Sequence, residues 1–257
     1  MVSSPRTILY FGPKPPDEVL ELLSDTFVLS KPSHSPTETP PDRSFDPDKD
    51  QVFFLHKEMA QSQVRLEFSS GLLDEALTPS VQLFNEYFGG GMAGLVFQEL
   101  REARALAYSA WARFFTPARP NEENILVGSI GCQADKTLDA VSAFLGLLKE
   151  MPLSETRWQS AHTSILSNYR TNPIVSRSVP GFVYSVEKLG LRVDPREARY
   201  QKLIESKIEN FTNFYEKQIK PRHVLLSIVG DSSKIDMGKL TKFGEITEVK
   251  PKQLFNR

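Results

Sequence analysis

The alternation of apolar and polar positions between residues 51 and 133 predicts four strands in two pairs, with two helices between the pairs. Val64, Leu66 and Phe68 alternate with polar residues, which is the period of a half-buried strand. Between the pairs, apolar residues recur every three or four positions, which is typical of helices. The expected strands are 52–55, 64–68, 107–115 and 125–132, and the expected helices are 79–88 and 95–104.

Helical periodicity dominates the next ninety residues, and two strand-like runs close the chain. Prolines and capping residues divide this stretch into several helices. The closing strands are expected at 223–229, which ends at Gly230-Asp231, and near 245–249, with a short helix between them. This order predicts an α+β fold with a mainly antiparallel sheet covered on one face by helices. An all-helical stretch separates the fourth strand from the last strands.

The N-terminal fifty residues have a different composition. Residues 7–11 form an apolar, strand-like run that ends at Gly12, and an amphipathic helix is expected to begin at Asp17. Residues 29–50 carry five prolines among polar residues and are expected to form a linker. We therefore divide the chain into residues 1–28, 29–50 and 51–257.

A strand, a glycine and a helix occur twice, at residues 7–26 and again from Val224 onward. The separation is about one domain length, as expected for a repeated domain. Two interpretations stay open. Residues 1–28 are the tail of a preceding homologous domain, or their strand belongs to the single sheet of this domain.

The net charge and the number of cysteines say little about function, and the charge does not favour a polyanionic partner. The formal net charge of the 257 residues is −1, so neither nucleic acid nor an anionic membrane surface is an expected partner. Cys132 is the single cysteine, so no disulfide can form within the chain. No apolar run reaches the roughly 18 residues that a membrane span needs.

Three consecutive glycines, Gly89, Gly90 and Gly91, begin a stretch that fits the G-x-G-x-x-G pattern of dinucleotide sites. That pattern requires a strand before the glycines and a helix after them, with an acidic residue at the end of the next strand. Here a helix is expected before the glycines, and the strand 111–115 has no acid at its end. We therefore interpret the glycines as a helix–helix turn that allows positive φ and close backbone approach.

Gln61-Ser62, the strand that runs to Gly71, and the sequence FNEYFGGGMAGLVFQELREARALAYSAW resemble the second-half domain of the pitrilysin/insulinase (M16) family of zinc metallopeptidases. The resemblance covers about residues 51–250. It implies the α+β fold of M16 and LuxS-like metallohydrolases, with paired homologous domains around a closed chamber. In such a pair the first domain holds zinc through a His-x-x-Glu-His helix, and the second holds no metal.

The histidines agree with a second-half domain. His34, His56, His162 and His223 are never four residues apart, and Ala60 stands four residues after His56. The helical ligand pair that zinc requires is therefore missing, and no metal or other cofactor is expected in this chain. The resemblance places the zinc in a homologous partner domain, either in the same full-length protein or in another subunit.

The resemblance also implies site residues. In active members the second domain supplies an Arg, and a Tyr seven residues later, which reach the substrate at the zinc. These fall on Arg101 and Tyr108, with peptide as the substrate, and the turn Gly89–Gly91 is expected at the chamber wall. The alternative function is a proteolytically inactive relative that serves as a scaffold or partner-binding subunit. Relatives with several such domains are often bacterial and exported, so an extracytoplasmic location is the expectation.

Overall fold

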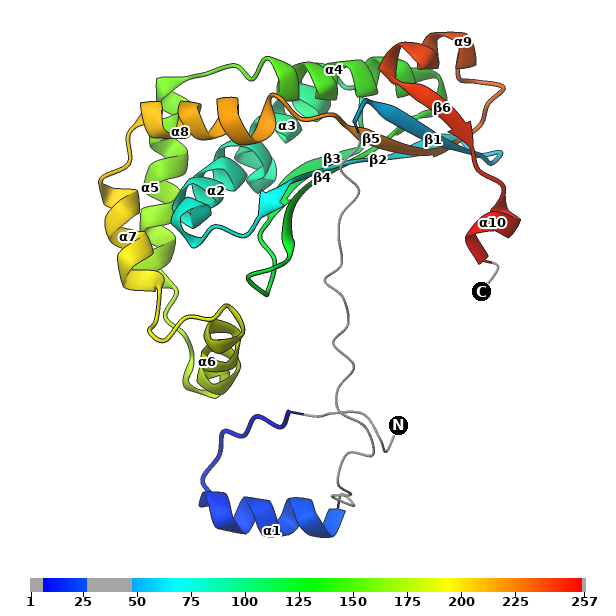
Figure 1. Cartoon of the computed structure of the whole chain (residues 1–257). Helices are drawn as coiled ribbons and strands as arrows, with labels where there is room; N and C mark the ends of the chain where they lie inside the picture. The colour runs from blue at the N-terminus through cyan, green and yellow to red at the C-terminus, as the bar shows by residue number, and fades with distance from the viewer. Residues whose placement is uncertain (1–6, 27–47, 256–257) are drawn as a thin grey trace.

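A single mixed sheet of six strands forms the centre of the fold in the computed structural model, which describes residues 7–26 and 48–255 (Figure 1). The strand order across the sheet is β3-β4-β2-β5-β1-β6. The pairs β3–β4, β4–β2 and β2–β5 are antiparallel, whereas β5–β1 and β1–β6 are parallel. The strands are β1 (Gln51–His56), β2 (Gln61–Leu72), β3 (Ser109–Phe115), β4 (Glu123–Gln133), β5 (Leu225–Gly230) and β6 (Glu245–Glu248).

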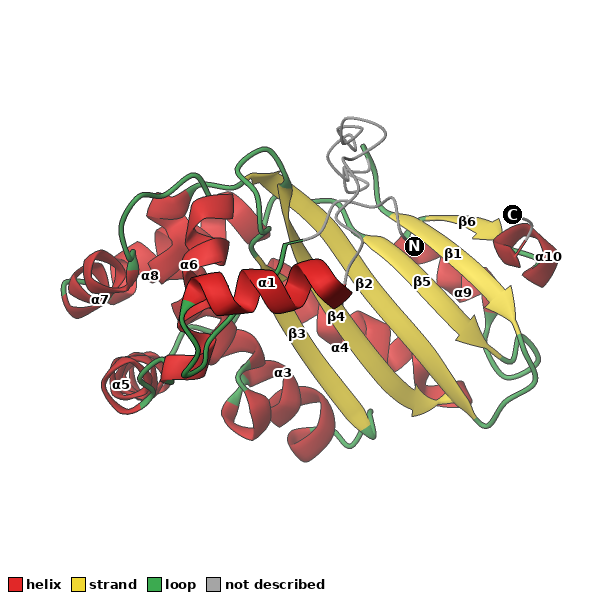
Figure 2. Ribbon diagram, turned by 90° about the horizontal axis from the view of Figure 1, so that it is seen from below, coloured by secondary structure: helices red, strands yellow, loops and turns green. Residues whose placement is uncertain are grey.

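The helix that directly follows β4 packs on one face of this sheet, and several later helices lie beyond the edge that β3 forms, as both views show (Figures 1 and 2). The α+β prediction is confirmed, including the all-helical stretch between the fourth strand and the last two strands. The helices are α1 (Pro16–Thr26), α2 (Thr78–Phe84), α3 (Leu95–Phe97), α4 (Thr137–Lys149), α5 (Glu155–Thr171), α6 (Val179–Lys188), α7 (Arg196–Ile204), α8 (Ile208–Phe214), α9 (Met237–Leu240) and α10 (Pro251–Phe255).

The predicted alternation in β2 sets which face of the sheet is buried. Val64, Leu66 and Phe68 are each at most 2 % exposed and lie on the helical side. In the register with β4, Leu66 is opposite Gly128, where an added Cβ would lie 2.5 Å from the ring of Phe144 on α4. The missing side chain at Gly128 therefore lets α4 lie directly on the sheet.

An aromatic cluster fixes α2 at the centre of the helical layer. Phe84 is fully buried and stacks on Phe88 at a centroid distance of 5.0 Å. Its ring also meets Phe114 of β3 at 6.5 Å and Phe214 of α8 at 5.8 Å. Each such pair stabilises the fold by about 0.5–1.5 kcal/mol in addition to the effect of burying its apolar area. The cluster thereby holds α2 against the edge strand β3.

Two buried tyrosines bind the connection between α4 and α5 to the core. The Tyr87 hydroxyl donates to the Pro152 carbonyl at 2.6 Å and accepts from the Ser154 amide at 3.0 Å. The Tyr215 hydroxyl donates to the carbonyl of Leu148 at 3.0 Å and accepts from the amide of Met151 at 3.0 Å. Burial raises the pKa of both phenols above the ordinary value, so both stay protonated donors.

The N-terminal segment departs from the prediction. Helix α1 forms, but residues 7–11 have no strand structure and pair with no strand of the sheet. The interpretation in which they join the single sheet of this domain is therefore wrong. Within the predicted linker 29–50, residues 29–47 lie outside the described residues, so the domain division itself stays a prediction.

We predict that Tyr87→Phe lowers the free energy of unfolding by about 0.5–1.5 kcal/mol for each hydrogen bond lost, because the buried ring loses the hydroxyl that bonds the Pro152 carbonyl and the Ser154 amide. Urea denaturation followed by circular dichroism measures the change. Tyr108→Phe is the matched control, since Tyr108 is 55 % exposed and should change stability by less than about 0.5 kcal/mol. Equal stabilities for Tyr87→Phe and the unaltered chain would contradict the assigned role of the Tyr87 hydroxyl.

Candidate functional site

The glycine turn joins two helical segments, as the sequence predicts. Helix α2 continues without a break into a π-helical segment, Asn85–Gly89. A short 3₁₀ turn, Gly91–Ala93, then leads into α3 and a second π-helical segment, Gln98–Ala103. The order strand–glycine–helix that a dinucleotide site requires is absent at this turn. The glycines therefore need an explanation other than phosphate binding.

Close packing against the edge of the sheet explains Gly89. A Cβ at Gly89 would lie 1.8 Å from the carbonyl oxygen of Ala112 in β3, a distance that no side chain can occupy. Gly91 has a φ of +59°, in the left-handed region that favours glycine. A Cβ at Gly90 would lie 2.2 Å from the carbonyl oxygen of Glu86, so the turn requires glycine at all three positions.

Asn85 completes the contact between this helix and β3. Its side-chain amide donates to the carbonyl of Phe114 at 2.8 Å, and its side-chain oxygen accepts from the Phe114 amide at 2.7 Å. Because β3 is the outermost strand at this side of the sheet, its outward backbone groups have no strand partner there. Asn85 satisfies one such pair and closes part of the edge. Sequence reasoning missed this role, since a polar residue on a helix gives no signal of a cross-element partner.

Two adjoining hollows lie beside the glycine turn and share Gln82, Asn85 and Arg113. One has a volume of about 370 Å³ and is bordered by all three turn glycines, and the other has a volume of about 260 Å³. Together they follow α2 and β3 from the glycine turn toward α7. Their lining is mixed polar and apolar, which suits an extended peptide better than a compact apolar ligand.

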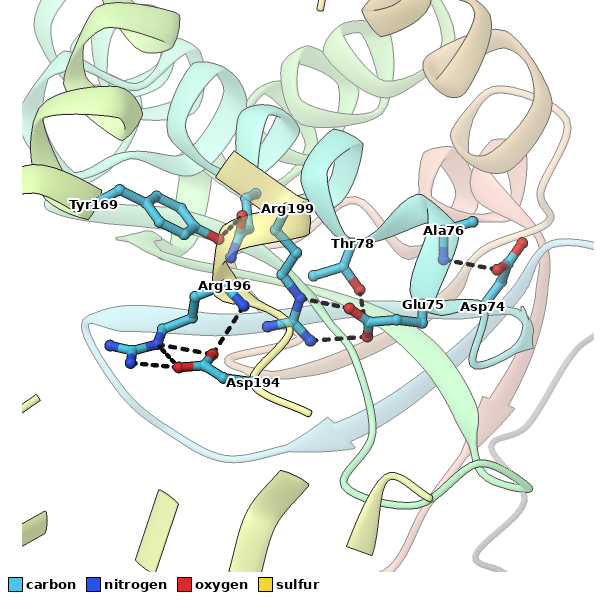
Figure 3. Close-up of polar contacts among 9 residues, drawn as sticks. Asp74, Glu75, Ala76, Thr78, Tyr169, Asp194, Arg196 and Arg199 are labelled. Carbon is cyan, nitrogen blue, oxygen red and sulfur yellow. Dashed lines mark hydrogen bonds and ion pairs between the residues drawn. The ribbon is translucent and has the colours of Figure 1, made fainter. Parts of the chain in front are cut away.

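A polar network borders the hollow nearer α7 (Figure 3). The Arg199 guanidinium donates two hydrogen bonds to the Glu75 carboxylate, at 2.5 and 2.8 Å, and Thr78 donates to the same carboxylate at 3.2 Å. Tyr169 donates to Gln82 at 2.9 Å. Bidentate pairing of this kind is geometrically specific, so it fixes α7 relative to the start of α2.

Arg101 lies in the second π-helical segment with its side chain about half exposed. Its guanidinium carbon is 4.9 Å from the centroid of the Phe97 ring, and its Nε is 3.8 Å from the Glu102 carboxylate. In a regular α-helix, side chains three or four residues apart would be the neighbours that pair. Glu99 instead pairs with Arg104, five residues on, at 3.6 Å, because the wider π-helical turn brings such residues together.

Tyr108 lies after a sharp turn that ends this helix. Ala105 has a φ of +48°, a left-handed conformation that is uncommon for residues other than glycine. The Leu106 amide donates to the Leu100 carbonyl at 2.9 Å, which closes the helix end. Tyr108 then precedes β3, with its amide donating to Gly131 at 2.8 Å and its ring 55 % exposed. In the described part of the chain, no hydrogen bond or ion pair joins Arg101 to Tyr108.

The described histidines have structural partners. His56 Nδ1 accepts from the Ser232 amide at 3.2 Å, and His223 lies 3.4 Å from Asp50. His162 stacks on Trp158, and His34 lies outside the described residues. Within residues 7–26 and 48–255, no group of three or more His, Cys, Asp or Glu side chains could hold a metal ion. The same residues contain no helix that is long and apolar enough to cross a membrane.

We predict that Gly89→Ala lowers the free energy of unfolding by about 1–3 kcal/mol, because the new Cβ forces α2 away from Ala112. Gly146→Ala is the matched control. A Cβ there would meet nothing within 4 Å, and replacing a glycine inside helix α4 by alanine should raise the free energy of unfolding by about 0.5–1 kcal/mol. Chemical denaturation of both variants measures the difference, and a Gly89→Ala protein of unaltered stability would argue against the close contact.

Comparisons with known proteins agree with this geometry. The family described as the peptidase M16 inactive domain matches residues 6–163. No curated protein matches the sequence.

Solved structures share the fold at low sequence identity. The peptidase M16 inactive domain from Pseudomonas fluorescens aligns with a TM-score of 0.65 and 15 % identity, over 84 % of this chain and 51 % of that one. A protease from Helicobacter pylori aligns with a TM-score of 0.65 and 15 % identity, over 84 % and 53 %. A conserved protein from Enterococcus faecalis V583 aligns with a TM-score of 0.64 and 14 % identity, over 87 % and 51 %.

The chain thus spans about half the length of these solved proteins. The family match, over residues 6–163, covers more than half of this chain, and the six-stranded fold agrees with that match. This chain belongs to the M16 peptidase family, as a domain of its inactive, C-terminal type.

Proposed function

We propose that this chain is the non-zinc domain of an M16-type zinc metalloendopeptidase and completes a zinc site on a homologous partner domain. The observation that carries the proposal is the placement of Arg101 and Tyr108. Both side chains are about half exposed and flank the turn at Ala105, and neither is needed by the core. They are therefore available to a second molecule or domain that approaches this end of the fold.

The chemistry of the two side chains suits the hydrolysis of a peptide bond. The zinc of the partner supplies Lewis acidity and an activated water. A developing oxyanion is stabilised by donors that are already in place, and a phenol hydroxyl and a guanidinium are such donors. Arg101 can also hold a carbonyl or carboxylate of the peptide with two hydrogen bonds.

The hollows beside Gly89, Gly90 and Gly91 suit the wall of a substrate chamber. The backbone is accessible there because the glycines carry no side chains, and Asn85 and Arg113 provide polar groups along the strand edge. An extended peptide can be held by such groups without a requirement for one sequence. We assign this wall to substrate contact and the Arg101–Tyr108 region to the reacting bond.

A second candidate function is a scaffold or partner-binding subunit without proteolytic activity. The environment of Arg101 favours it, since stacking on Phe97 and a long contact with Glu102 are ordinary for a surface arginine. The two functions differ in one measurable respect. Only the first requires the Tyr108 hydroxyl and the Arg101 charge for turnover.

We expect Tyr108→Phe to lower kcat by about 10²- to 10³-fold in the assembled enzyme, with little change in KM, because one oxyanion donor is lost. Arg101→Ala should lower kcat/KM to a similar extent. The assay combines this chain with its zinc-bearing domain and follows cleavage of a fluorogenic peptide. Arg104→Ala is the control, since Arg104 pairs with Glu99 and has no assigned role at the reacting bond.

Thermal unfolding of each variant separates a chemical defect from a folding defect. Unaltered kcat in both Tyr108→Phe and Arg101→Ala would exclude their catalytic role. An assembled protein that cleaves no peptide with either the unaltered chain or the variants would favour the scaffold.

A further inference from the structure

Arg113, on the edge strand β3, is the one charged residue among those described that borders both hollows beside the glycine turn. Its guanidinium carbon is 5.4 Å from the centroid of the Phe115 ring. A cation–π contact of this kind holds the guanidinium in place but uses none of its N–H donors. Within residues 7–26 and 48–255, no carboxylate pairs with Arg113 and no acceptor bonds to its side chain. The donors of Arg113 are therefore available to a ligand.

The hollow nearer α7 carries a net positive charge. Its charged lining residues are Glu75, Arg199 and Arg113. The charge of the Glu75 carboxylate is already balanced, because it accepts two hydrogen bonds from Arg199 and one from Thr78 (Figure 3). Arg113 is thus the lining charge without a counter-ion, and an anion that enters this hollow meets a cation with unused donors.

The neighbouring hollow, which the three glycines border, differs in charge. It contains Glu86, whose carboxylate accepts a hydrogen bond of 2.6 Å from the Ser164 hydroxyl. Glu86 does not border the hollow nearer α7. An anionic group is therefore favoured at the end of the groove near α7 and disfavoured at the end near the glycines.

The remaining lining of the hollow nearer α7 suits the stem of an acidic side chain. Leu73, Phe114, Pro117 and Leu189 supply apolar surface. The volume of about 260 Å³ lies just below the range of pockets for small molecules, which begins at about 300 Å³. Apolar walls around one unpaired guanidinium fit a short aliphatic stem that ends in a carboxylate.

We propose that Arg113 is a specificity-determining residue that binds a carboxylate of the peptide, either an acidic side chain or the C-terminal carboxylate. The guanidinium donates two hydrogen bonds to this carboxylate while it stays on the Phe115 ring. The inference rests on the proposed function in taking an extended peptide as the ligand of the groove. It goes beyond that function by naming the charge that the peptide carries.

The position of Arg113 also sets where the carboxylate lies relative to the reacting bond. Arg113 is five residues after Tyr108, which directly precedes β3. A strand rises about 3.3 Å per residue, so the two positions are ~16 Å apart, a distance that an extended peptide spans with about four to six residues. The preferred peptide therefore has its acidic residue, or its C-terminus, at this spacing from the cleaved bond.

Equilibrium binding to this chain tests the inference without turnover. The probes are peptides of alanine, serine and leucine, acetylated and amidated, of about ten residues so that they span the groove. One set contains a single glutamate, a second has glutamine in its place, and a third has glutamine and a free C-terminal carboxylate. By isothermal titration calorimetry, the glutamate or the free-acid peptides should bind about tenfold more tightly than the blocked glutamine peptides, as expected for one charge-assisted pair. The set that shows the preference identifies the source of the carboxylate.

Matched variants assign the preference to one side chain. Arg113→Gln should abolish the preference but keep the affinity for glutamine peptides within about twofold, and Arg113→Glu should reverse the preference toward a lysine peptide. Arg119→Gln is the control, because Arg119 is exposed, pairs with Glu122 at 3.5 Å and borders neither hollow. It removes the same charge and should keep the preference. Arg113 is exposed, so its variants should keep the Tm of the unaltered chain.

Three results would overturn the inference. The first is equal affinity for peptides with and without a carboxylate, including no binding by any of them. The second is a preference that survives Arg113→Gln, and the third is a preference that Arg119→Gln weakens as much as Arg113→Gln does. A failure of the proposed function looks different, because the assembled protein then cleaves no peptide while this chain still prefers a carboxylate and loses the preference in Arg113→Gln.

Discussion

The contact between α2 and the edge strand β3 is the constraint on which the rest of the site depends. At one end, Gly89 brings the helix against the Ala112 carbonyl, closer than any other residue would permit. Four residues earlier, Asn85 hydrogen-bonds to both backbone groups of Phe114. Phe84 and Phe88 fill the space between helix and sheet. The position of α2 therefore determines the position of the glycine turn and of the segment that carries Arg101.

The helical segments around the turn depart from regular α-helix in ways that matter for the proposed chemistry. The π-helical turn at Gln98–Ala103 alters which side chains are neighbours, so Glu99 meets Arg104 and Arg101 is left with a long contact to Glu102. The left-handed Ala105 then reverses the chain before Tyr108. Local departures of this kind cost free energy and persist where surrounding packing determines them. Here the fully buried Leu100 anchors the segment.

The two ends of the chain present one strand–helix motif in two states. Near the C-terminus the motif is packed: β5 is hydrogen-bonded on both edges, and α9 buries Leu240. Near the N-terminus a similar sequence is exposed and forms its helix but not its strand. The difference follows from the nature of the elements, since a helix satisfies its hydrogen bonds internally and a strand requires neighbours.

The sequence by itself determined most elements between residues 51 and 249, the α+β class, the position of the glycines in a turn between two helical segments, and the family. These follow from local periodicity and from a long contiguous motif, which need no knowledge of distant contacts. Only the tertiary structure decided the strand order, the role of Asn85 against Phe114 and the pairing of Glu75 with Arg199. Each joins positions far apart in the chain, and a polar residue on a helix does not indicate its distant partner. The strand expected at 7–11 was wrong for this domain for the same reason, because whether a strand forms depends on the sheet available to receive it.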